Sequence, residues 1–502
     1  MKVVNIMNFV RRIDERMEDS TRRLLEFTTQ QLRLVNEFGL ENTFLLQYDA
    51  LCDGDFVSLF KKEATDQTEL GLWYEIVEPL TTACGMPYRS EMGWKWDWHI
   101  IPGFSMAYTP QQRERLMDEA MRKFRETFGF YPKTVASWVL DTHTLNYLAE
   151  NYDVKAVAIC RDQANTDAYT LLGGYFNQAY YPSRKNIFTP AQTREMQVDV
   201  PVLRLLGPCP IHNYDGQKYC SGEVKARWGW SSCFTLEPCW HMGSDPDVVD
   251  WMFRSYYDEE SLGFAYAQIG QENSFVEVAE RVLEGTRMQI SKLLQRGDVT
   301  FQRMSQTGEV FRQRFPVQTP ATSVVASDNW DSPDIQSVYY DCKNYTANLF
   351  RYEDKVFFRS FYLFDEQVED LYLEQTCTTF DAVYENLPVV DTMFCAERKA
   401  CGLGIDGPGA RFVVRKAGEG VLRVDTGSNC VVFYENRIEI GASKLIWYAN
   451  SRKAEVEIRD AWILLSYKGT RYRLRVEGAE INNREGNMEM VSRDGHITIY
   501  TA

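Results

Sequence analysis

The sequence of 502 residues lacks the patterns that mark several common protein classes. None of its 12 cysteines forms a C-x-x-C pair or a zinc-type array with histidine, so buried free thiols are favoured over zinc modules or a disulfide framework. No apolar run is long enough to cross a bilayer, and the N-terminal segment does not have the pattern of a signal peptide. We therefore expect a soluble protein, cytoplasmic by default, and periplasmic or secreted if a leader has been removed.

Positive charge is also scarce. The net charge of -16 argues against nucleic acid or an anionic membrane as partner, because phosphate binding needs a basic surface. No G-x-S-x-G, H-E-x-x-H or Walker lysine motif is present, which excludes serine hydrolases, zincins and P-loop enzymes. Gly402, Gly404 and Gly407 spell G-x-G-x-x-G, but a strand-like segment follows instead of a helix, so no dinucleotide cofactor is expected.

Aromatic residues, by contrast, are plentiful, with 12 Trp, 28 Tyr and 28 Phe. Such a composition suits proteins that stack flat ligands such as sugar rings, although a large core also uses aromatic residues. A chain of 502 residues is too long for one core, so two or three domains are expected.

The first 315 residues alternate strand-like and helix-like segments. Thr134–Val139 predicts a buried strand that ends near Asp141, a helical pattern follows, and Val154–Ile159 predicts a second strand. Because strand, helix and strand in this order form a parallel pair, seven or eight such units predict a closed β/α barrel of the α/β class. The other predicted strands are Val3–Val10, Asn42–Gln47, Glu69–Trp73, Pro201–Leu206, Leu262–Ile269 and Val299–Phe301.

The sequence pattern changes at Phe315–Pro333, where Pro, Ser and Thr cluster and the helical periodicity of apolar residues disappears. Beyond it, short segments alternate apolar and polar residues between Gly and Asp turns, a pattern typical of an antiparallel β-sandwich. We predict a barrel domain over residues 1–315, a linker over 316–333 and a β-sandwich over 334–502.

Acidic residues stand at several predicted strand ends. The candidates are Glu75, Asp141 and Glu272, with Asp97 and Asp162 on adjacent loops. Cleavage of a glycosidic bond needs two carboxyl groups, one ionised and one protonated, and burial at a shared pocket drives their pKa values apart. The alternative is that each is a surface acid or a helix N-cap, and Asp141 lies just before a predicted helix.

One loop gathers Trp94, Trp96, Asp97, Trp98 and His99. So many aromatic rings around one acid predict a wall that stacks sugars, with a hydrophobic lid as the alternative. The five histidines of the chain share no metal-ligand spacing, so no metal is expected.

The stretch around Asp141 resembles the fourth-strand block of the glycoside hydrolase/deacetylase β/α-barrel superfamily, especially glycoside hydrolase family fifty-seven. That block reads roughly G-x-x-P-x-x-x-W-x-x-E, and this chain has Gly129, Pro132, Trp138 and Asp141, followed by Asp162 after the next strand. The resemblance implies that Asp141 is the nucleophile.

A second segment, IGQENSFVE, resembles the D-G-E-N-x-W-E block of the same family. Glu272 and Asn273 match its E-N, whereas Gly270 stands where its first acid is expected. The whole chain also resembles two-domain proteins of gut Bacteroidetes in this superfamily. The substrate-binding candidates, besides the aromatic loop, are Trp73, Trp138, Asp162, Tyr181, Trp240, His241 and Asn273.

These observations predict a glycoside hydrolase that acts on carbohydrate, with Asp141 as nucleophile, Glu272 as acid/base and Glu75 in reserve. One alternative is a carbohydrate-binding protein that has lost catalysis, which the missing acid at Gly270 favours. A metal-dependent deacetylase is disfavoured, because the resemblance implies an aspartate pair after the first strand and an H-x-x-x-H later, and Asp14 stands alone.

Overall fold

A computed structural model describes residues 1–213, 234–258, 262–330, 332–392 and 401–501. Its N-terminal part is built on a parallel sheet whose strand order is β10-β5-β4-β3-β2-β1-β11, with β12 paired to β1. The strands of this sheet are β1 (Lys2–Val10), β2 (Asn42–Leu46), β3 (Thr68–Trp73), β4 (Thr134–Ala136), β5 (Ala156–Ile159), β10 (Val202–Arg204), β11 (Ala265–Ile269) and β12 (Thr300–Phe301).

The sheet curls into a nearly closed barrel. Between β10 and β11, the two ends of the path, Leu206 N–H donates to Gln268 Oε1 at 2.7 Å. The predicted β/α barrel is thus confirmed. The strand bounds agree with the sequence pattern to within three residues at each end; β4 ends three residues before its predicted end, and β11 begins three residues after its predicted start.

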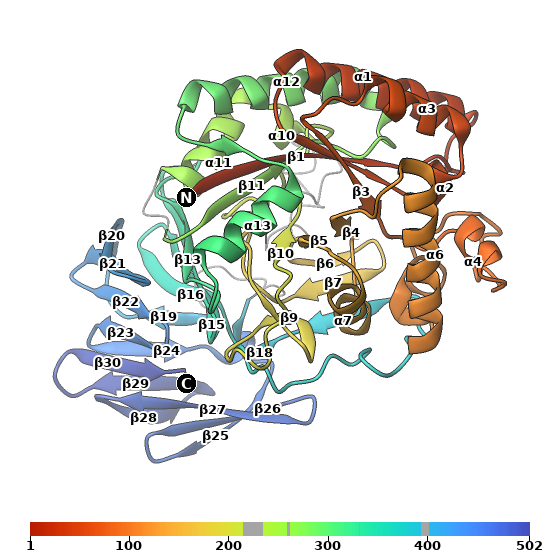
Figure 1. Ribbon diagram of the computed structural model, residues 1–502. Coiled ribbons are helices and arrows are strands. Elements are labelled where there is room, and N and C mark those ends of the chain that lie inside the picture. The colour runs from red at the N-terminus through yellow and green to blue at the C-terminus, as the bar shows by residue number, and fades with distance from the viewer. Residues whose placement is uncertain (214–233, 259–261, 331, 393–400, 502) are drawn as a thin grey trace.

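Helices cover the outside of the barrel, as Figure 1 shows for α1, α12 and α6. Helix α6 illustrates how the sequence sets their ends. Thr109 and Gln112 form a capping box, and Gly129 ends the helix in the left-handed conformation. The helices are α1 (Ser20–Phe38), α2 (Tyr48–Leu51), α3 (Gly54–Glu63), α4 (Glu78–Ala83), α5 (Ile100–Gly103), α6 (Pro110–Phe128), α7 (Thr142–Asn151), α10 (His241–Ser244), α11 (Pro246–Tyr257), α12 (Ala279–Arg296) and α13 (Met304–Arg314).

The C-terminal part consists of two antiparallel sheets, which confirms the predicted β-sandwich. Their facing sides enclose a second core that includes Leu349, Phe358, Phe433 and Ile463. The first sheet contains β13 (Thr322–Ala326), β14 (Ile335–Cys342), β15 (Tyr345–Tyr352), β16 (Lys355–Leu363), β18 (Leu387–Asp391), β19 (Leu403–Ile405), β24 (Lys444–Trp447), β28 (Ala479–Arg484) and β29 (Asn487–Ser492). The second contains β20 (Gly409–Gly418), β21 (Val421–Gly427), β22 (Cys430–Tyr434), β23 (Arg437–Gly441), β25 (Glu455–Arg459), β26 (Trp462–Tyr467), β27 (Thr470–Glu477) and β30 (His496–Tyr500).

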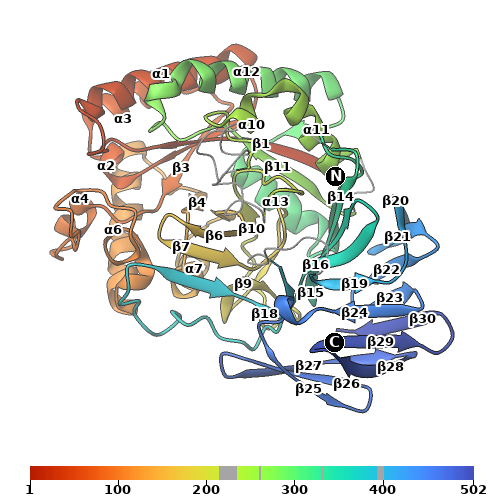
Figure 2. The same ribbon diagram turned by 180° about the vertical axis from the view of Figure 1, so that it is seen from behind.

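The sandwich packs against the barrel, as the view from behind in Figure 2 also shows. Strands β14 and β15 are buried on both faces because Tyr339 and Phe350 join the barrel core while Val338 and Leu349 join the sandwich core. Strand β13 lies within the predicted linker and forms one edge of the first sheet.

The excursion after β5 lies in this junction. Its strands are β6 (Gln163–Thr166), β7 (Tyr169–Leu172), β8 (Pro182–Ser183) and β9 (Asn186–Pro190), and β17 (Ala382–Glu385) of the C-terminal part pairs with β7. The ring of Phe176 stacks on Tyr339 at 3.7 Å. In the parts of the chain that are described, no helix has the length and apolar character needed to span a membrane.

Candidate active site

Three charged side chains from different strand ends meet inside the barrel. Arg11 directly follows β1, Glu75 lies two residues after β3 and Glu272 three residues after β11. Arg11 Nη2 lies 3.0 Å from Glu272 Oε2 and 3.9 Å from Glu75 Oε2. The two carboxyl oxygens are therefore within about 7 Å of each other. The carboxyl ends of parallel strands share one edge of a barrel, which is why residues so distant in sequence converge here.

Glu75 is the acid of this group with the most perturbed surroundings. It is 1% exposed and accepts hydrogen bonds from Gln47 Nε2 at 2.7 Å and Trp96 Nε1 at 3.3 Å. Burial raises the pKa of Glu75 to about 7, although the Arg11 guanidinium opposes the shift, and the Glu272 carboxylate adds to the rise. A carboxyl group with this pKa is about half protonated at neutral pH, so it can donate a proton.

Glu272 is held by the strand ends themselves. Its carboxylate accepts hydrogen bonds from Arg11 and from Ser274 Oγ. The neighbouring Asn273 locks β11 to β1, since its Nδ2 donates to the Arg11 carbonyl at 2.8 Å and its Oδ1 accepts from the Arg11 N–H at 3.1 Å. Asn273 therefore positions the Arg11–Glu272 pair.

A further acid, Glu237, lies near this group and was not predicted. It accepts hydrogen bonds from Thr235 Oγ1 at 2.9 Å and Gln271 Nε2 at 3.2 Å. Burial raises the pKa of Glu237 to about 7, and the nearby Glu272 carboxylate contributes to the rise. The sequence did not mark Glu237 as a candidate, because no predicted strand ends just before it.

Aromatic rings line the group. Two guanidinium groups lie against the Trp96 ring, with Arg11 at 4.0 Å and Arg16 at 4.8 Å from its centroid. Trp73 stacks on Phe9 at 4.1 Å, and Trp138 meets the edge of Trp73 at 4.8 Å. Trp73, Trp96 and Trp138, all predicted from the sequence, thus lie beside the carboxyl pair. Arg11 and Arg16 were not predicted, because glycoside cleavage needs carboxyl groups and the sequence does not show that an arginine joins them.

Several buried polar atoms of the group have no hydrogen-bond partner among the described residues. They are Glu75 Oε1, Gln47 Oε1 and Arg11 Nε. Buried polar atoms are nearly always paired with protein, water or ligand. The unpaired atoms therefore mark a polar interior space that water or a ligand hydroxyl would fill.

The prediction for Asp141 is corrected by its surroundings. Asp141 is fully buried and is the N-cap of α7, where it accepts hydrogen bonds from the N–H and Oγ1 of Thr144. It also accepts from Ser105 Oγ and forms an ion pair at 2.9 Å with the buried Arg113. Its oxygens are thus fully occupied by the fold, and no hydrogen bond or ion pair of the described residues links it to Glu272. The capping alternative holds, so we do not retain Asp141 as the nucleophile.

The aromatic loop divides into an inner and an outer part. Trp96 points to Glu75, whereas Trp94, Trp98 and His99 are half-buried, with Trp98 at 5.7 Å from Trp94 and 5.3 Å from His99. Asp97 is buried and orients His99, whose Nδ1 lies 2.7 Å from Asp97 Oδ1. The outer rings form a partly exposed row.

The remaining predicted site residues lie elsewhere. Asp162 is ion-paired with the buried Arg204 at 2.9 Å, and Tyr181 is buried with its hydroxyl bonded to the Phe315 carbonyl. Trp240 packs on Phe275 in a small apolar cluster outside the barrel, and His241 is exposed. Asp162 and Tyr181 thus have structural partners, Trp240 belongs to an apolar cluster and His241 lies at the surface, so we do not retain these four residues as substrate-binding candidates.

A steric contact explains why position 270 carries glycine where the family-like motif has an acid. Gly270 has φ +104°, and a Cβ at this position would lie 2.1 Å from the Met7 carbonyl oxygen. No residue with a side chain fits unless β1 moves. The departure from the family-like motif is therefore built into the packing of β1 against β11.

A metal-dependent deacetylase, the alternative that the sequence disfavours, would need several metal ligands that converge on one point. Within the described ranges, no three His, Cys, Asp or Glu side chains are arranged to hold a metal ion. Asp14 is bound by Arg16 through two hydrogen bonds, of 2.8 and 2.6 Å, and lies 3.9 Å from Arg11. A fixed guanidinium thus stands among the carboxylates, and the described residues do not fit a metal centre.

The fold is a β/α barrel with carboxylates at the ends of its strands. A protein of Parabacteroides distasonis, described as a candidate glycoside hydrolase/deacetylase, has the same fold, with a TM-score of 0.60 at 16% identity over 80% of this chain and 93% of its own. This similarity shows that the two chains share their fold.

Residues 16–327 match a family described as a domain of unknown function with a solved structure, DUF3863, and the chain belongs to that family. A Mycobacterium smegmatis protein described as a candidate polysaccharide deacetylase gives a TM-score of 0.36 at 14% identity over 62% of this chain and 91% of its own. A branching enzyme of glycoside hydrolase family 57 from Thermococcus kodakaraensis gives a TM-score of 0.32 at 8% identity, over 61% of this chain and 71% of its own. The comparison with curated proteins finds no match.

Proposed function

We propose that this protein is a carbohydrate-processing enzyme, and specifically a glycoside hydrolase that uses Glu75 and Glu272 as its two carboxyl groups. The observation that carries the proposal is the pair itself: two strand-end carboxyls within about 7 Å, joined by Arg11, one of them with its pKa raised to about 7. The fold shared with the Parabacteroides protein, itself described as a candidate glycoside hydrolase/deacetylase, supports the carbohydrate class.

In this proposal Glu75 is the general acid. Its protonated form donates a proton to the glycosidic oxygen as the bond to the anomeric carbon breaks. Glu272, ion-paired with Arg11, is the ionised partner that either attacks the anomeric carbon or removes a proton from the attacking water. The upper bound of about 7 Å includes the retaining separation of ~5–5.5 Å and only the lower end of the inverting range of ~6.5–9.5 Å.

The aromatic groups would bind the sugar. Trp98 and His99 present a stacked, half-buried pair of rings on which the face of a sugar can lie. Trp96 fixes Glu75 by its indole N–H and contacts the guanidinium groups of Arg11 and Arg16. A sugar on the outer rings would thus extend toward the inner carboxyl pair.

The competing proposal is a carbohydrate-binding protein without catalysis. The sequence favours it through the missing acid at Gly270, but that position cannot accept a side chain, so the absence does not indicate lost chemistry. A metal-dependent deacetylase finds no support in the described donor set.

The test uses substrates with two different leaving groups to distinguish the general acid from the ionised carboxylate. Turnover of phenyl and 2,4-dinitrophenyl glycosides from a panel of sugars is measured for the unaltered protein, Glu75→Gln and Glu272→Gln. A dinitrophenolate leaves without protonation, whereas a phenolate needs the acid more. Glu75→Gln should therefore lose about 10²–10⁴-fold on phenyl glycosides and far less on dinitrophenyl glycosides. Glu272→Gln should lose at least about 10³-fold on both.

The matched control is Glu119→Gln, an acid on the outer helix α6 that hydrogen-bonds Tyr48 and Arg122. It should keep full turnover on both substrates. Equal losses for Glu75→Gln on the two leaving groups would remove Glu75 as the acid. No turnover by the unaltered protein on any glycoside of the panel, together with saturable sugar binding, would support the binding protein instead.

A further inference from the structure

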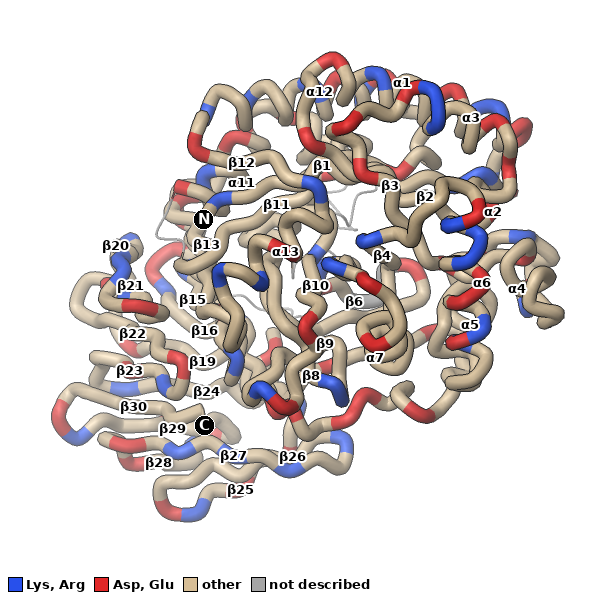
Figure 3. Tube along the Cα trace, in the orientation of Figure 1, with Lys and Arg blue, Asp and Glu red and all other residues tan. Residues whose placement is uncertain are grey.

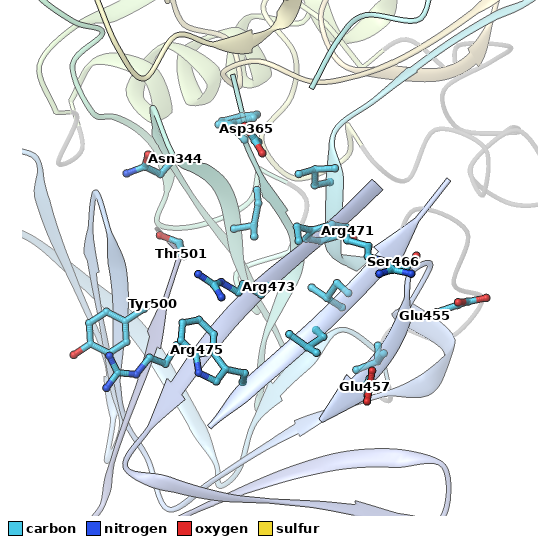
Figure 4. Close-up of a pocket in the computed structure, with 18 of the residues that line it drawn as sticks. Asn344, Asp365, Glu455, Glu457, Ser466, Arg471, Arg473, Arg475, Tyr500 and Thr501 are labelled. Carbon is cyan, nitrogen blue, oxygen red and sulfur yellow. The ribbon is translucent and has the colours of Figure 1, made fainter. Parts of the chain in front are cut away.

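A second cavity, of about 1130 Å³, lies in the C-terminal half, away from the barrel carboxylates. Figure 4 shows its shape: Asn344 and Asp365 lie on one side, and side chains of β25, β26 and β27 lie on the other. Gln192 from the excursion after β5 also lines it. The cavity therefore forms where the second sandwich sheet faces the junction with the barrel.

The regular alternation of a strand puts three arginines on the cavity side of β27. Arg471, Arg473 and Arg475 line the cavity, whereas Leu474 and Val476 point into the sandwich core. Successive residues on one face of a strand are about 7 Å apart. In register with them on β26 are Ser466, Leu464 and Trp462. The result is a periodic row of guanidinium groups over a mixed polar and aromatic floor.

The charge of this lining differs from that of the chain. The net charge of the protein is -16, and acidic and basic residues alternate over most of its trace (Figure 3). The cavity, however, has more basic residues than acidic ones. Its basic residues are Lys343, Arg459, Arg471, Arg473 and Arg475, and its acidic residues are Asp365, Glu455 and Glu457.

The arginines of the cavity differ in whether a carboxylate binds their guanidinium group. Arg459 is bound by Glu457 at 2.7 Å, and Arg475 is bound by Glu477. Among the described residues, Arg471 and Arg473 have no carboxylate within ion-pair distance. The Arg473 guanidinium instead lies 4.4 Å above the centroid of the Trp462 ring. A guanidinium held flat on an indole has its donor edge free for a planar or multidentate anion.

The rest of the lining suits a sugar. Trp462, Tyr472 and Tyr500 provide ring faces, and the amides of Gln192 and Asn344 can pair with hydroxyl groups. Glu455 and Glu457 stand at one edge of the cavity in Figure 4 and Tyr500 at the opposite edge, with Arg475 beside Tyr500, Arg473 near the centre and Arg471 beside Ser466.

We propose that this cavity is a binding site for an anionic carbohydrate, a glycan that carries carboxylate or sulfate groups at intervals. The arginines would bind the anionic groups, and Trp462 with the amides would bind the sugar rings. The site is separate from the barrel, and it does not rest on the activity proposed there.

The test measures binding by titration calorimetry with three probes of similar size: oligogalacturonate for carboxylate, oligomeric dextran sulfate for sulfate, and neutral dextran oligomers. We expect saturable binding of at least one anionic probe, weakened by added salt, and none of the neutral probe. Which anionic probe binds better identifies the anionic group. Because bonds to charged groups are strong, Arg473→Gln and Arg471→Gln should each weaken binding about 10–100-fold, and Trp462→Ala should weaken it similarly.

The matched control is Arg415→Gln, on the exposed face of β20 at the other end of the same sheet. It should leave the affinity unchanged, and so should Glu75→Gln in the barrel. All four arginine and tryptophan positions are at least partly exposed, and thermal denaturation confirms that each variant is folded. The proposal is overturned if neither anionic probe binds, if Arg415→Gln weakens binding as much as Arg473→Gln, or if a single-stranded DNA oligomer competes with equal affinity.

Discussion

The ends of β3 and β4, neighbours in the barrel, each carry a completely buried acid, Glu75 and Asp141. Asp141 accepts four hydrogen bonds, including one from a guanidinium at 2.9 Å. Glu75 accepts two, its nearest guanidinium nitrogen is 3.9 Å away, and its Oε1 has no partner among the described residues.

The difference shows that burial at a strand end does not by itself make a reactive carboxyl. The charge of Asp141 is balanced by Arg113, and both of its carboxylate oxygens accept hydrogen bonds from the protein, so this side chain stabilises the fold. Glu75 is buried without full compensation, and its raised pKa is the result. The unpaired oxygen and the shifted pKa, more than the position, distinguish a chemical role from a structural one.

The largest effect is expected where the structural acid is changed. Asp141→Asn leaves Arg113 buried without its counter-ion, which should lower the free energy of unfolding by about 3–5 kcal/mol. Glu75→Gln removes a half-ionised buried carboxyl, so it should not lower the free energy of unfolding and should raise it by up to about 3 kcal/mol. Chemical denaturation at pH 7 measures both. Equal destabilisation would erase the distinction between the two acids.

A third strand end extends the comparison. Gly270→Ala places a Cβ against the Met7 carbonyl at a backbone conformation that favours glycine, and it should cost about 2–4 kcal/mol. Gly297→Ala provides the control, since its φ of +71° is also left-handed but its Cβ would meet nothing within 4 Å. It should cost about 1 kcal/mol. Similar losses in the two variants would show that backbone conformation alone, without the contact to β1, requires glycine.

The raised pKa of Glu75 should appear in the pH dependence of stability. Between its ordinary pKa of 4.5 and its folded pKa of about 7, the folded chain holds a proton that the unfolded chain has released. The contribution of Glu75 is therefore full below pH 4.5 and is lost as the pH rises through 7, by up to about 3 kcal/mol. Glu75→Gln should remove this loss, and the difference between the two denaturation curves from pH 4.5 to 8 measures it. Parallel curves would contradict the shift.

The smallest expected effect concerns the indole bond. Trp96→Phe keeps a ring against Arg11 and Arg16 but removes the hydrogen bond to Glu75. The pKa of Glu75 should then rise further, by roughly one unit or about 1.4 kcal/mol. The midpoint of carboxyl protonation in the infrared spectrum reports it. A lowered midpoint would mean that Trp96 does not stabilise the charged form.

Much of the barrel follows from the sequence. The bounds of helix α6 are set locally, by its capping residues and its terminal glycine, which the sequence itself displays. Strands such as β2 and β3 were found from short apolar runs that the barrel buries. The tract Gly173–Tyr181, by contrast, is buried at the junction with the sandwich, a contact that only the tertiary structure creates.

The site was harder to predict for the same reason. A strand-end aspartate before a helix looks alike whether it caps the helix or acts in catalysis, and the partner that decides, Arg113, lies 28 residues earlier on α6. Glu75 and Glu272 were found because both follow predicted strands. Arg11 was missed although it also follows a strand, since its role depends on carboxylates more than 60 residues away.

The most direct measurement is the protonation of Glu75 itself, which requires no substrate. The infrared band of protonated carboxyl groups is titrated in the unaltered protein and in Glu75→Gln, and the difference isolates this one side chain. A carboxyl that loses its proton near pH 7 and is missing from the variant is the predicted result. A difference band that disappears near pH 4.5, as for an ordinary glutamate, would contradict the role of Glu75 as the acid.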